Sequence, residues 1–290
     1  MRYGVYVPNF GPYSDARVLA ELAYEAEEAG WDGFFLWDQV SKSTLTPTID
    51  AMVDPWIALT AIALRTRTIL LGPLVTPLPR RRPWMVARET VSLDHLSGGR
   101  LVFGVGAGGG YYDFEAMGEV SDAKTLAALL DEGLEVLTDL WSGERYSHEG
   151  VAYHIKEAQF LPRPLQSPRI PIWVANLWPA KAPLRRAVRW DGIVPIGRDL
   201  PLEAMLSPEE MQEIVRSVIS QPGYTTPFEV VHMGITGGVD GVHDREVAVA
   251  YQQVGVTWWV EKILPELWGS WTEWPLEAMR MRIMKGPPGK

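Results

Sequence analysis

The sequence predicts an α/β fold: a single TIM barrel of eight parallel strands, formed by residues 1–290 as one domain. Short apolar segments alternate with longer amphipathic segments eight times along the chain, which is the pattern of a closed (β/α) eight-stranded barrel. The length of 290 residues suits one such barrel. The main alternative is a doubly wound open sheet, which carries a glycine fingerprint after its first strand. The first turn here, residues 8–12, lacks that fingerprint.

The segments expected to be strands are short and mostly apolar throughout, as strands covered on both faces should be. The third of them is nearly all apolar over eight residues. The predicted strands are residues 3–7, 32–37, 68–75, 100–106, 172–175, 191–195, 228–233 and 257–260.

The intervening helices are indicated by apolar residues spaced three and four apart. Leu19, Leu22 and Ala26 form one such stripe, and Asp54 followed by Pro55 is an N-cap with proline at the first helical position. The predicted helices are residues 15–29, a helix beginning at 55, a helix from 83 to a stop at 98–99, and residues 121–141, 179–190, 208–220, 244–254 and 275–284.

Two segments fall outside this alternation. Residues 143–171 are rich in proline and polar groups, and they predict an insertion before the fifth strand with a short hairpin within residues 146–155. Residues 285–290 carry two glycines and two prolines and predict a flexible C-terminal tail.

Composition limits the class of function. The chain has no cysteine, which excludes disulfides and thiolate chemistry and is compatible with the cytoplasm. The formal net charge of −9 disfavours a nucleic-acid partner. No apolar segment approaches the ~18 residues that a membrane span needs. The 13 tryptophans indicate a large core, a pocket or a subunit interface.

In a barrel of this class, the residues that follow each strand build the active site. That rule needs no knowledge of a family, and it selects residues at all eight strand ends. The residues selected are Asn9, Asp38, Gln39, Thr76, Gly106 to Gly110, Asn176, residues 196–198, His232, Met233 and Glu261.

Several residues at or near these strand ends have two interpretations. The glycine run at 106–110 either lets main-chain N–H groups approach a phosphate or is a loop that needs positive φ angles. Residues 80–82, three arginines, either attract an anion or form a solvated cluster. Asp38 either contacts a cofactor ring or pairs with an arginine, and His232 is either an acid/base group or a structural residue.

Familiar catalytic motifs are absent from the sequence. No spacing of His, Asp and Glu resembles a metal site, and neither a Gly-x-Ser-x-Gly elbow nor a phosphate-binding P-loop occurs. When a cofactor carries out the reaction, few protein groups need to react themselves. These absences therefore favour redox chemistry performed by a bound cofactor.

The chain resembles the bacterial luciferase-like superfamily of flavin monooxygenases and deazaflavin-dependent oxidoreductases. Most of the chain takes part, in the right order. The residues that carry the resemblance are Leu71-Gly72-Pro73-Leu74-Val75-Thr76-Pro77, Leu93-Asp94-His95-Leu96-Ser97-Gly98-Gly99-Arg100, and residues 30–33, 36–38, 54–56, 82–83, 88–90, 104–106, 171–175 and 190–192.

The resemblance implies where a cofactor lies. A flavin or deazaflavin ring, from FMN or coenzyme F420, would lie over the third strand at a non-proline cis peptide, which Leu74-Val75 and the following Thr76 match best. Asp38 would contact the polar edge of the ring. The phosphate arm would lie near Gly106, Gly108 and the turn formed by Ala175, Asn176 and Leu177.

One position departs from the family pattern. Many deazaflavin-dependent relatives have histidine after the aspartate of the second strand, and here Gln39 follows Asp38. Glutamine forms hydrogen bonds but does not shuttle protons near neutral pH. The acid/base role is then vacant or has moved, with His232 and Glu261 as the candidates.

The function we expect is hydride transfer or monooxygenation of a small organic substrate by a cytoplasmic homodimer. A cofactor-binding scaffold without catalysis, motivated by Gln39, is the first alternative. A lyase or isomerase that handles a sugar phosphate on the same barrel is the second.

Overall fold

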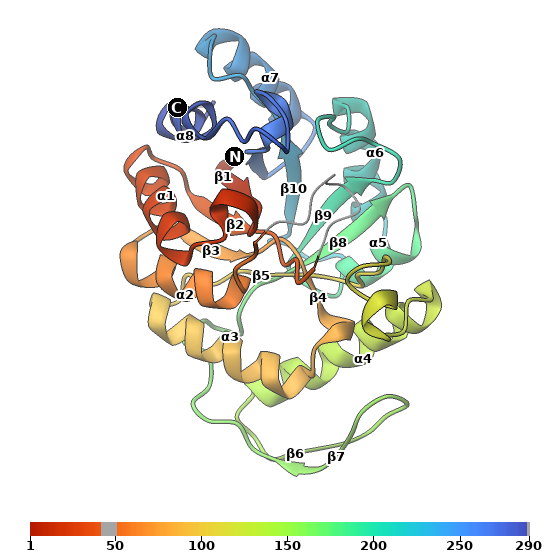
Figure 1. Ribbon diagram of the computed structural model, residues 1–290. Coiled ribbons are helices and arrows are strands. Elements are labelled where there is room, and N and C mark those ends of the chain that lie inside the picture. Colours follow the sequence, from red (N-terminus) through yellow and green to blue (C-terminus); the bar gives the residue numbers. More distant parts are fainter. Residues whose placement is uncertain (42–50, 289–290) are drawn as a thin grey trace.

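The computed structural model describes residues 1–41 and 51–288. Nine strands lie side by side in one sheet, every pair of neighbours being parallel, in the order β3-β2-β1-β11-β10-β9-β8-β5-β4 (Figure 1). Their bounds are β1 Arg2–Val7, β2 Gly33–Leu36, β3 Leu70–Pro73, β4 Thr76–Pro77, β5 Phe103–Gly106, β8 Ile172–Trp178, β9 Gly192–Gly197, β10 Glu229–Gly234 and β11 Trp258–Lys262.

The sheet closes on itself through β3 and β4, which are two halves of the predicted third strand. The main-chain N–H of Leu71 donates to Arg100 (3.0 Å), and the N–H of Val102 donates back to Leu71 (2.9 Å). Beyond the break, Thr76 of β4 pairs with Val105 of β5. An eight-stranded barrel is thereby closed, and the predicted fold class is confirmed.

Glycine is required where the strands meet. A Cβ at Gly72 would lie 1.9 Å from the carbonyl oxygen of Val102, and a Cβ at Gly104 would lie 2.2 Å from that of Pro73. Only glycine leaves room for main chains this close.

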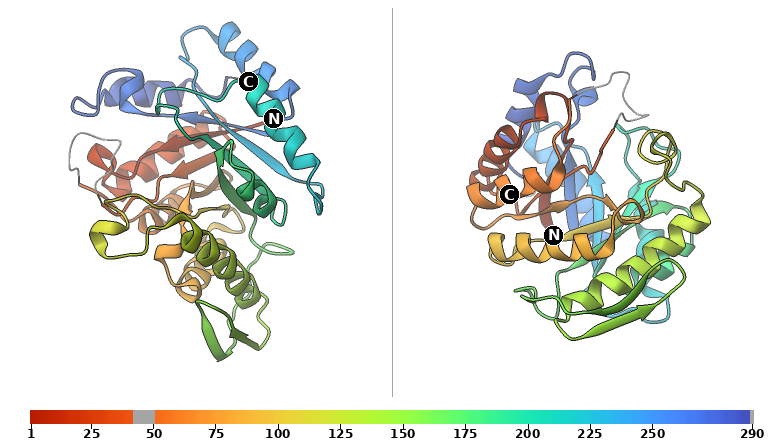
Figure 2. Two further views of the ribbon diagram at one scale, coloured as in Figure 1. Left: turned by 90° about the vertical axis from the view of Figure 1, so that its right-hand side faces the viewer. Right: turned by 60° about the horizontal axis from the view of Figure 1, so that its bottom comes forward.

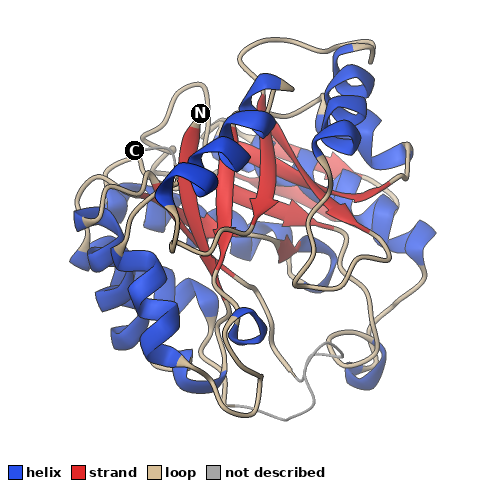
Figure 3. Cartoon of the chain, turned by 90° about the horizontal axis from the view of Figure 1, so that it is seen from above, coloured by secondary structure: helices blue, strands red, loops and turns tan. Residues whose placement is uncertain are grey.

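Helices surround the barrel (Figure 3), and most begin at caps that the sequence supplies. Asp54 and Asp122 accept hydrogen bonds from the first turns of their helices, and Ser207 with Glu210 forms a capping box. The helices are α1 Ala16–Glu28, α2 Pro55–Arg65, α3 Pro83–Ser97, α4 Ala123–Trp141, α5 Ala182–Ala187, α6 Pro208–Ile219, α7 Gly241–Gln253 and α8 Leu276–Met284; the 3-10 turns are Gly11–Tyr13, Leu78–Arg80, Glu115–Met117 and Pro265–Leu267.

The insertion between α4 and β8 contains the expected hairpin. Strands β6 (Tyr146–Glu149) and β7 (His154–Ala158) are antiparallel and stand away from the barrel (Figure 2). Glu132 of α4 holds the turn between them by accepting hydrogen bonds from the N–H groups of Ala152 and Tyr153.

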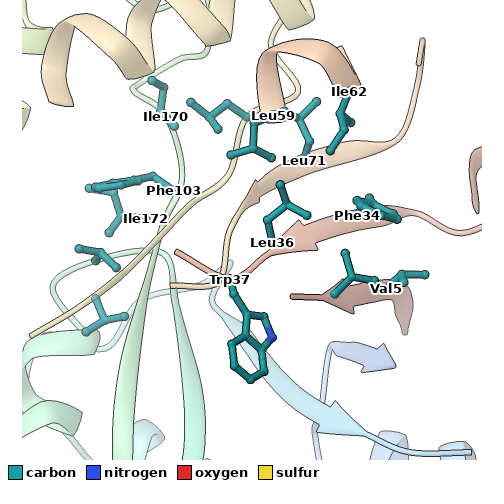
Figure 4. Close-up of a cluster of buried hydrophobic side chains, with 14 of the residues drawn as sticks. Val5, Phe34, Leu36, Trp37, Leu59, Ile62, Leu71, Phe103, Ile170 and Ile172 are labelled. Atoms are coloured by element: carbon teal, nitrogen blue, oxygen red, sulfur yellow. The ribbon is translucent and has the colours of Figure 1, made fainter. Parts of the chain in front are cut away.

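Two apolar clusters fill the fold. The larger lies between the sheet and the helices, where Leu36, Leu59 and Leu71 meet (Figure 4). The smaller lies inside the barrel and contains three large aromatic rings. Trp173 and Trp258 are in edge contact at 5.2 Å between centroids, and Phe35 touches both. This aromatic plug fills the interior, so open space is left at the carboxyl ends of the strands.

The expected flexible tail is wrong for the part that the structure describes. Gly286, Pro287 and Pro288 are buried, and the carbonyl oxygen of Gly286 accepts a hydrogen bond from Arg282 (2.8 Å). Apolar proline rings and this buried donor give the segment a packing site. Residues 289–290 lie outside the described residues.

Candidate functional site

A cavity of about 410 Å³ opens at the carboxyl ends of the strands. Its floor and near wall come from Leu74, Val75 and the segment that follows β2. Its far wall is the β9–α6 connection, residues 198–207, together with the ends of β9, β10 and β11. Most of the lining is apolar, as in sites that bind organic cofactors and substrates.

The expected non-proline cis peptide is present between Leu74 and Val75, and both residues border the cavity. Trp37 also borders it and stacks on Tyr6, with ring centroids 5.6 Å apart. Thr76, the residue after Val75, is buried.

Asp38 is the centre of a buried charge network. Its side chain is fully buried and accepts hydrogen bonds from Arg80 (2.5 Å), Arg81 (3.1 Å) and the hydroxyl of Thr76 (2.6 Å). Of the two interpretations of Asp38, the structure favours the arginine pair. The interpretation of residues 80–82 as a solvated cluster is wrong for Arg80, whose side chain is only 6% exposed.

Asp113 belongs to the same network and was not predicted. Its carboxylate accepts hydrogen bonds from Arg80 (3.0 Å), from the Gln39 amide (3.2 Å) and from the N–H of Ser41 (3.1 Å). Asn9 fixes the Gln39 main chain by donating to its carbonyl oxygen (2.9 Å). Gln39 and Asp113 therefore border the cavity as one fixed polar edge.

His232 is buried and lies at the edge of the cavity. Its ring stacks on Tyr251 of α7, with centroids 4.0 Å apart, and makes a tilted ring contact with Trp259. Its Nε2 has no hydrogen-bond partner among the described residues. Burial, reinforced by the nearby Lys262 charge, lowers the pKa of His232 to about 3. A ring that is neutral at pH 7 and packed toward a helix argues against the expected acid/base role.

This pKa predicts how stability depends on pH. Between pH 6.5 and 3 the unfolded chain binds a proton that folded His232 does not, so stability falls as the pH is lowered, by about 1.4 kcal/mol per pH unit. His232→Phe should remove this contribution, so that it loses about 2 kcal/mol less than wild type between pH 6.5 and 5. Urea unfolding at each pH measures the difference. His154→Phe, at an exposed hairpin position, should keep the wild-type slope.

Glu261 is fully buried but does not border the cavity. Its carboxylate accepts hydrogen bonds from the N–H of Thr236 (2.6 Å) and the Trp259 indole (2.7 Å), and it pairs with Arg282 (3.3 Å). All of these partners belong to the layer outside the barrel. The placement argues against the expected acid/base role of Glu261.

Lys262, the next residue, does border the cavity and was not predicted. Its Nζ donates to the carbonyl oxygens of Leu202 (2.6 Å) and Ala204 (2.5 Å) in the far wall. Burial lowers its pKa to about 8. The predicted strand ended at residue 260, whereas β11 continues to Lys262. Strict alternation would have indicated this residue, because Trp258 and Val260 already face the barrel interior.

The residues expected to hold a phosphate arm lie on β5, in the loop after β5 and on β8. A Cβ at Gly106 would lie 3.0 Å from Val75 and 3.4 Å from the Ala175 side chain, so these three residues meet. Gly108 borders the cavity with a φ of +72°. Asn176 is buried, donates to the Ala180 carbonyl oxygen (3.0 Å), and leaves its Oδ1 without a partner among the described residues.

Comparison with known protein families agrees with this arrangement. The family model described as luciferase-like monooxygenase matches residues 1–213, well over half of the chain. The chain belongs to this family. The sequence resemblance is thereby confirmed at the level of the superfamily.

Two relatives and one solved structure illustrate what this luciferase-like chain is similar to. An F420-dependent glucose-6-phosphate dehydrogenase of Microbacterium testaceum is 30% identical over 66% of this chain, which spans 55% of that relative's length. An uncharacterized protein of Mycobacterium tuberculosis is 31% identical over 80% of this chain and 82% of its own. An F420-dependent secondary alcohol dehydrogenase, solved with an F420-acetone adduct, aligns over 100% and 99% of the two chains with a TM-score of 0.77 and 13% identity.

The luciferase-like cavity fits an organic redox cofactor. Its apolar floor accommodates a planar ring, and the main chain at Gly108, with its positive φ, borders it. Among the described residues, no group of His, Asp and Glu could hold a metal ion. No helix in that part of the chain is long and apolar enough to span a bilayer.

Proposed function

We propose that the protein is an oxidoreductase that binds coenzyme F420 or FMN in the barrel mouth and acts on a small organic substrate. The observation that carries the proposal is the apolar cavity of about 410 Å³ with Leu74 and Val75 as its floor. Family membership supports it, and so does the F420 in the names of one relative and one solved structure.

The side chains divide the work as follows. When bound, the cofactor ring supplies hydride transfer or oxygen activation, and the apolar walls exclude water from it. Leu74 and Val75 support the ring. Asp38 positions this floor by accepting a hydrogen bond from the Thr76 hydroxyl. Gln39 and Asp113 offer hydrogen bonds along the polar edge of the cavity.

The phosphate arm of the cofactor takes a separate set of residues in this proposal. Gly106, Gly108, Ala175, Asn176 and Leu177 lie along adjacent strands β5 and β8 and the loop after β5. Main-chain N–H groups and the Asn176 amide are neutral partners for an anion.

Cofactor titration tests the proposal. Wild-type protein should bind F420 or FMN with a change in the visible spectrum, whereas Val75→Trp should weaken binding at least tenfold, because the indole fills the floor. Val151→Trp is the matched control, since Val151 is 97% exposed in the turn between β6 and β7. Failure of wild type to bind either cofactor would contradict the proposed function.

We also propose a cytoplasmic homodimer in which each chain acts as one domain. The observation that supports self-association is an apolar patch on neighbouring helices: Ile57 and Leu64 on α2 and Met85 on α3 are 63%, 70% and 54% exposed. Exposed apolar side chains gathered on one face favour a subunit interface. A chain without cysteine has no need of an oxidising compartment.

Leu64→Glu should separate the dimer. A charge placed within the patch is expected to raise the dimer dissociation constant at least tenfold. Light scattering across a concentration series measures the mass, and Val151→Glu on the hairpin should leave it unchanged. A monomeric wild type at every concentration would refute the dimer.

A further inference from the structure

The hydrogen bonds that hold the Lys262 side chain in place leave part of its ammonium group unused. The residue is only 7% exposed, and its ammonium group has three N–H bonds, of which the structure engages two. Both acceptors, the carbonyl oxygens of Leu202 and Ala204, belong to the far wall of the cavity. The third position of Nζ takes no protein partner among the described residues, and Lys262 borders the cavity.

Lys262 can keep both hydrogen bonds when its ammonium group loses a proton. A neutral amine keeps two N–H donors and gains one lone pair, so it can hold both carbonyl oxygens and present the lone pair at the third position. The charged form presents an N–H there instead. Lys262 can therefore take up or release a proton while the far wall stays in place.

The groups around Nζ make both states accessible. Burial disfavours the ammonium, and the carboxylates of Glu203 in the far wall and Glu261 on β11 partly offset that effect. His232 on β10 stays neutral, and Tyr6, the partner of Lys262 across β1, has its pKa raised by burial and stays protonated. The outcome is a pKa of Lys262 of about 8, within reach of neutral pH.

We propose that Lys262 is the acid/base residue of this site, and that the substrate is an alcohol or the corresponding carbonyl compound. This inference rests on the proposed function. In oxidation, the hydride of the substrate C–H bond would pass to the oxidised flavin or deazaflavin that this site would hold. The O–H proton passes to the Lys262 lone pair, and a carbonyl forms. Reduction runs the same steps backwards, with the ammonium as the proton source.

The location supports this assignment over the other candidates. Gln39 cannot carry the proton, Glu261 lies outside the barrel, and the His232 ring is stacked against α7. Lys262 borders the same cavity as Leu74 and Val75.

Two variants separate the catalytic role from anchoring of the wall. Lys262→Arg keeps the charge and the donors to both carbonyl oxygens but cannot lose a proton near neutral pH. Lys262→Met removes both functions. If Lys262 is the acid/base, both variants should bind cofactor within threefold of wild type, and both should lose turnover of 2-butanol or 2-butanone by about 10²–10⁴-fold. A residue that only anchors the wall would leave Lys262→Arg with wild-type turnover, which would overturn the proposal.

Chemical rescue provides a further test, because the chain has no cysteine of its own. Lys262→Cys treated with 2-bromoethylamine acquires an amine of nearly the original length, whose sulfur makes it slightly more acidic. Turnover should return, with its pH profile shifted toward lower pH. Recovery of turnover with the untreated thiol, or no recovery after complete alkylation, would count against the proposal.

A readout without substrate or cofactor completes the design. In protein labelled with ¹³C at lysine Cε, one resonance should titrate with a midpoint near pH 8 and should be missing from Lys262→Met. A midpoint near 10.5 would overturn the acid/base role and leave the proposed function standing. Failure of wild type to bind cofactor would instead reject the proposed function itself.

Discussion

Arg80→Met should destabilise the protein by about 3 kcal/mol, because it leaves buried negative charge without its main partner. Arg80 lies between two carboxylates, at 2.5 Å from Asp38 and 3.0 Å from Asp113, and its side chain is almost fully buried. Arg81 still contacts Asp38 at 3.1 Å in the variant, which keeps the loss near the lower end for broken buried pairs. Urea unfolding at pH 7 measures the effect.

A matched variant separates burial from charge. Arg65→Met breaks an ion pair with Glu21 that is exposed on both sides and screened by solvent, so it should cost much less stability than Arg80→Met. The Arg80→Met variant should also bind cofactor more weakly, because Arg80 helps to hold Asp113, which accepts a hydrogen bond from the Gln39 amide at the cavity edge. Equal losses of stability in the two variants would show that the buried network is not the cause.

Gly72→Ala should destabilise the barrel by about 3 kcal/mol and weaken cofactor binding. The new Cβ would lie 1.9 Å from the Val102 carbonyl oxygen, and this neighbour is backbone that cannot rotate away. To relieve the contact, β3 must separate from the segment before β5, which opens the sheet at its point of closure and moves Leu74 and Val75. Urea unfolding and cofactor titration report the two effects.

Gly241→Ala is the control for the same chemical change. Gly241 is the first residue of α7, its φ is not positive, and a Cβ there meets no atom within 4 Å. Alanine at this site should stabilise the protein by up to about 1 kcal/mol. If Gly72→Ala were as stable as Gly241→Ala, the account of barrel closure given above would be incorrect.

The fold could be predicted because strands covered on both faces are apolar along their whole length, which separates them clearly from amphipathic helices. The positions at which the strands end were harder to predict. The polar residues Asn176 and Lys262 belong to β8 and β11, yet the predictions stopped at 175 and 260, where the apolar runs end. Hydrogen bonding to neighbouring strands, which no local pattern reveals, extends both strands.

The candidate site was partly predictable for the same reason. The rule that strand ends carry function placed Asp38, Gln39 and Gly108 at the cavity, but it also selected Glu261, whose side chain faces outward. The arginine partners of Asp38 lie 42 and 43 residues away, and Asp113 lies 74 residues from Gln39. Contacts across such separations depend on the closed barrel and leave no mark in the local sequence.

The aromatic plug formed by Phe35, Trp173 and Trp258 makes the cavity a dead end. Ligands that share a blind chamber enter and leave through one mouth, so the deeper of two must arrive first and depart last. If a cofactor lies on the Leu74–Val75 floor, a substrate above it blocks its exit. Cofactor can then exchange only between turnovers. The shape of the cavity, and not affinity, sets the order in which the two ligands bind.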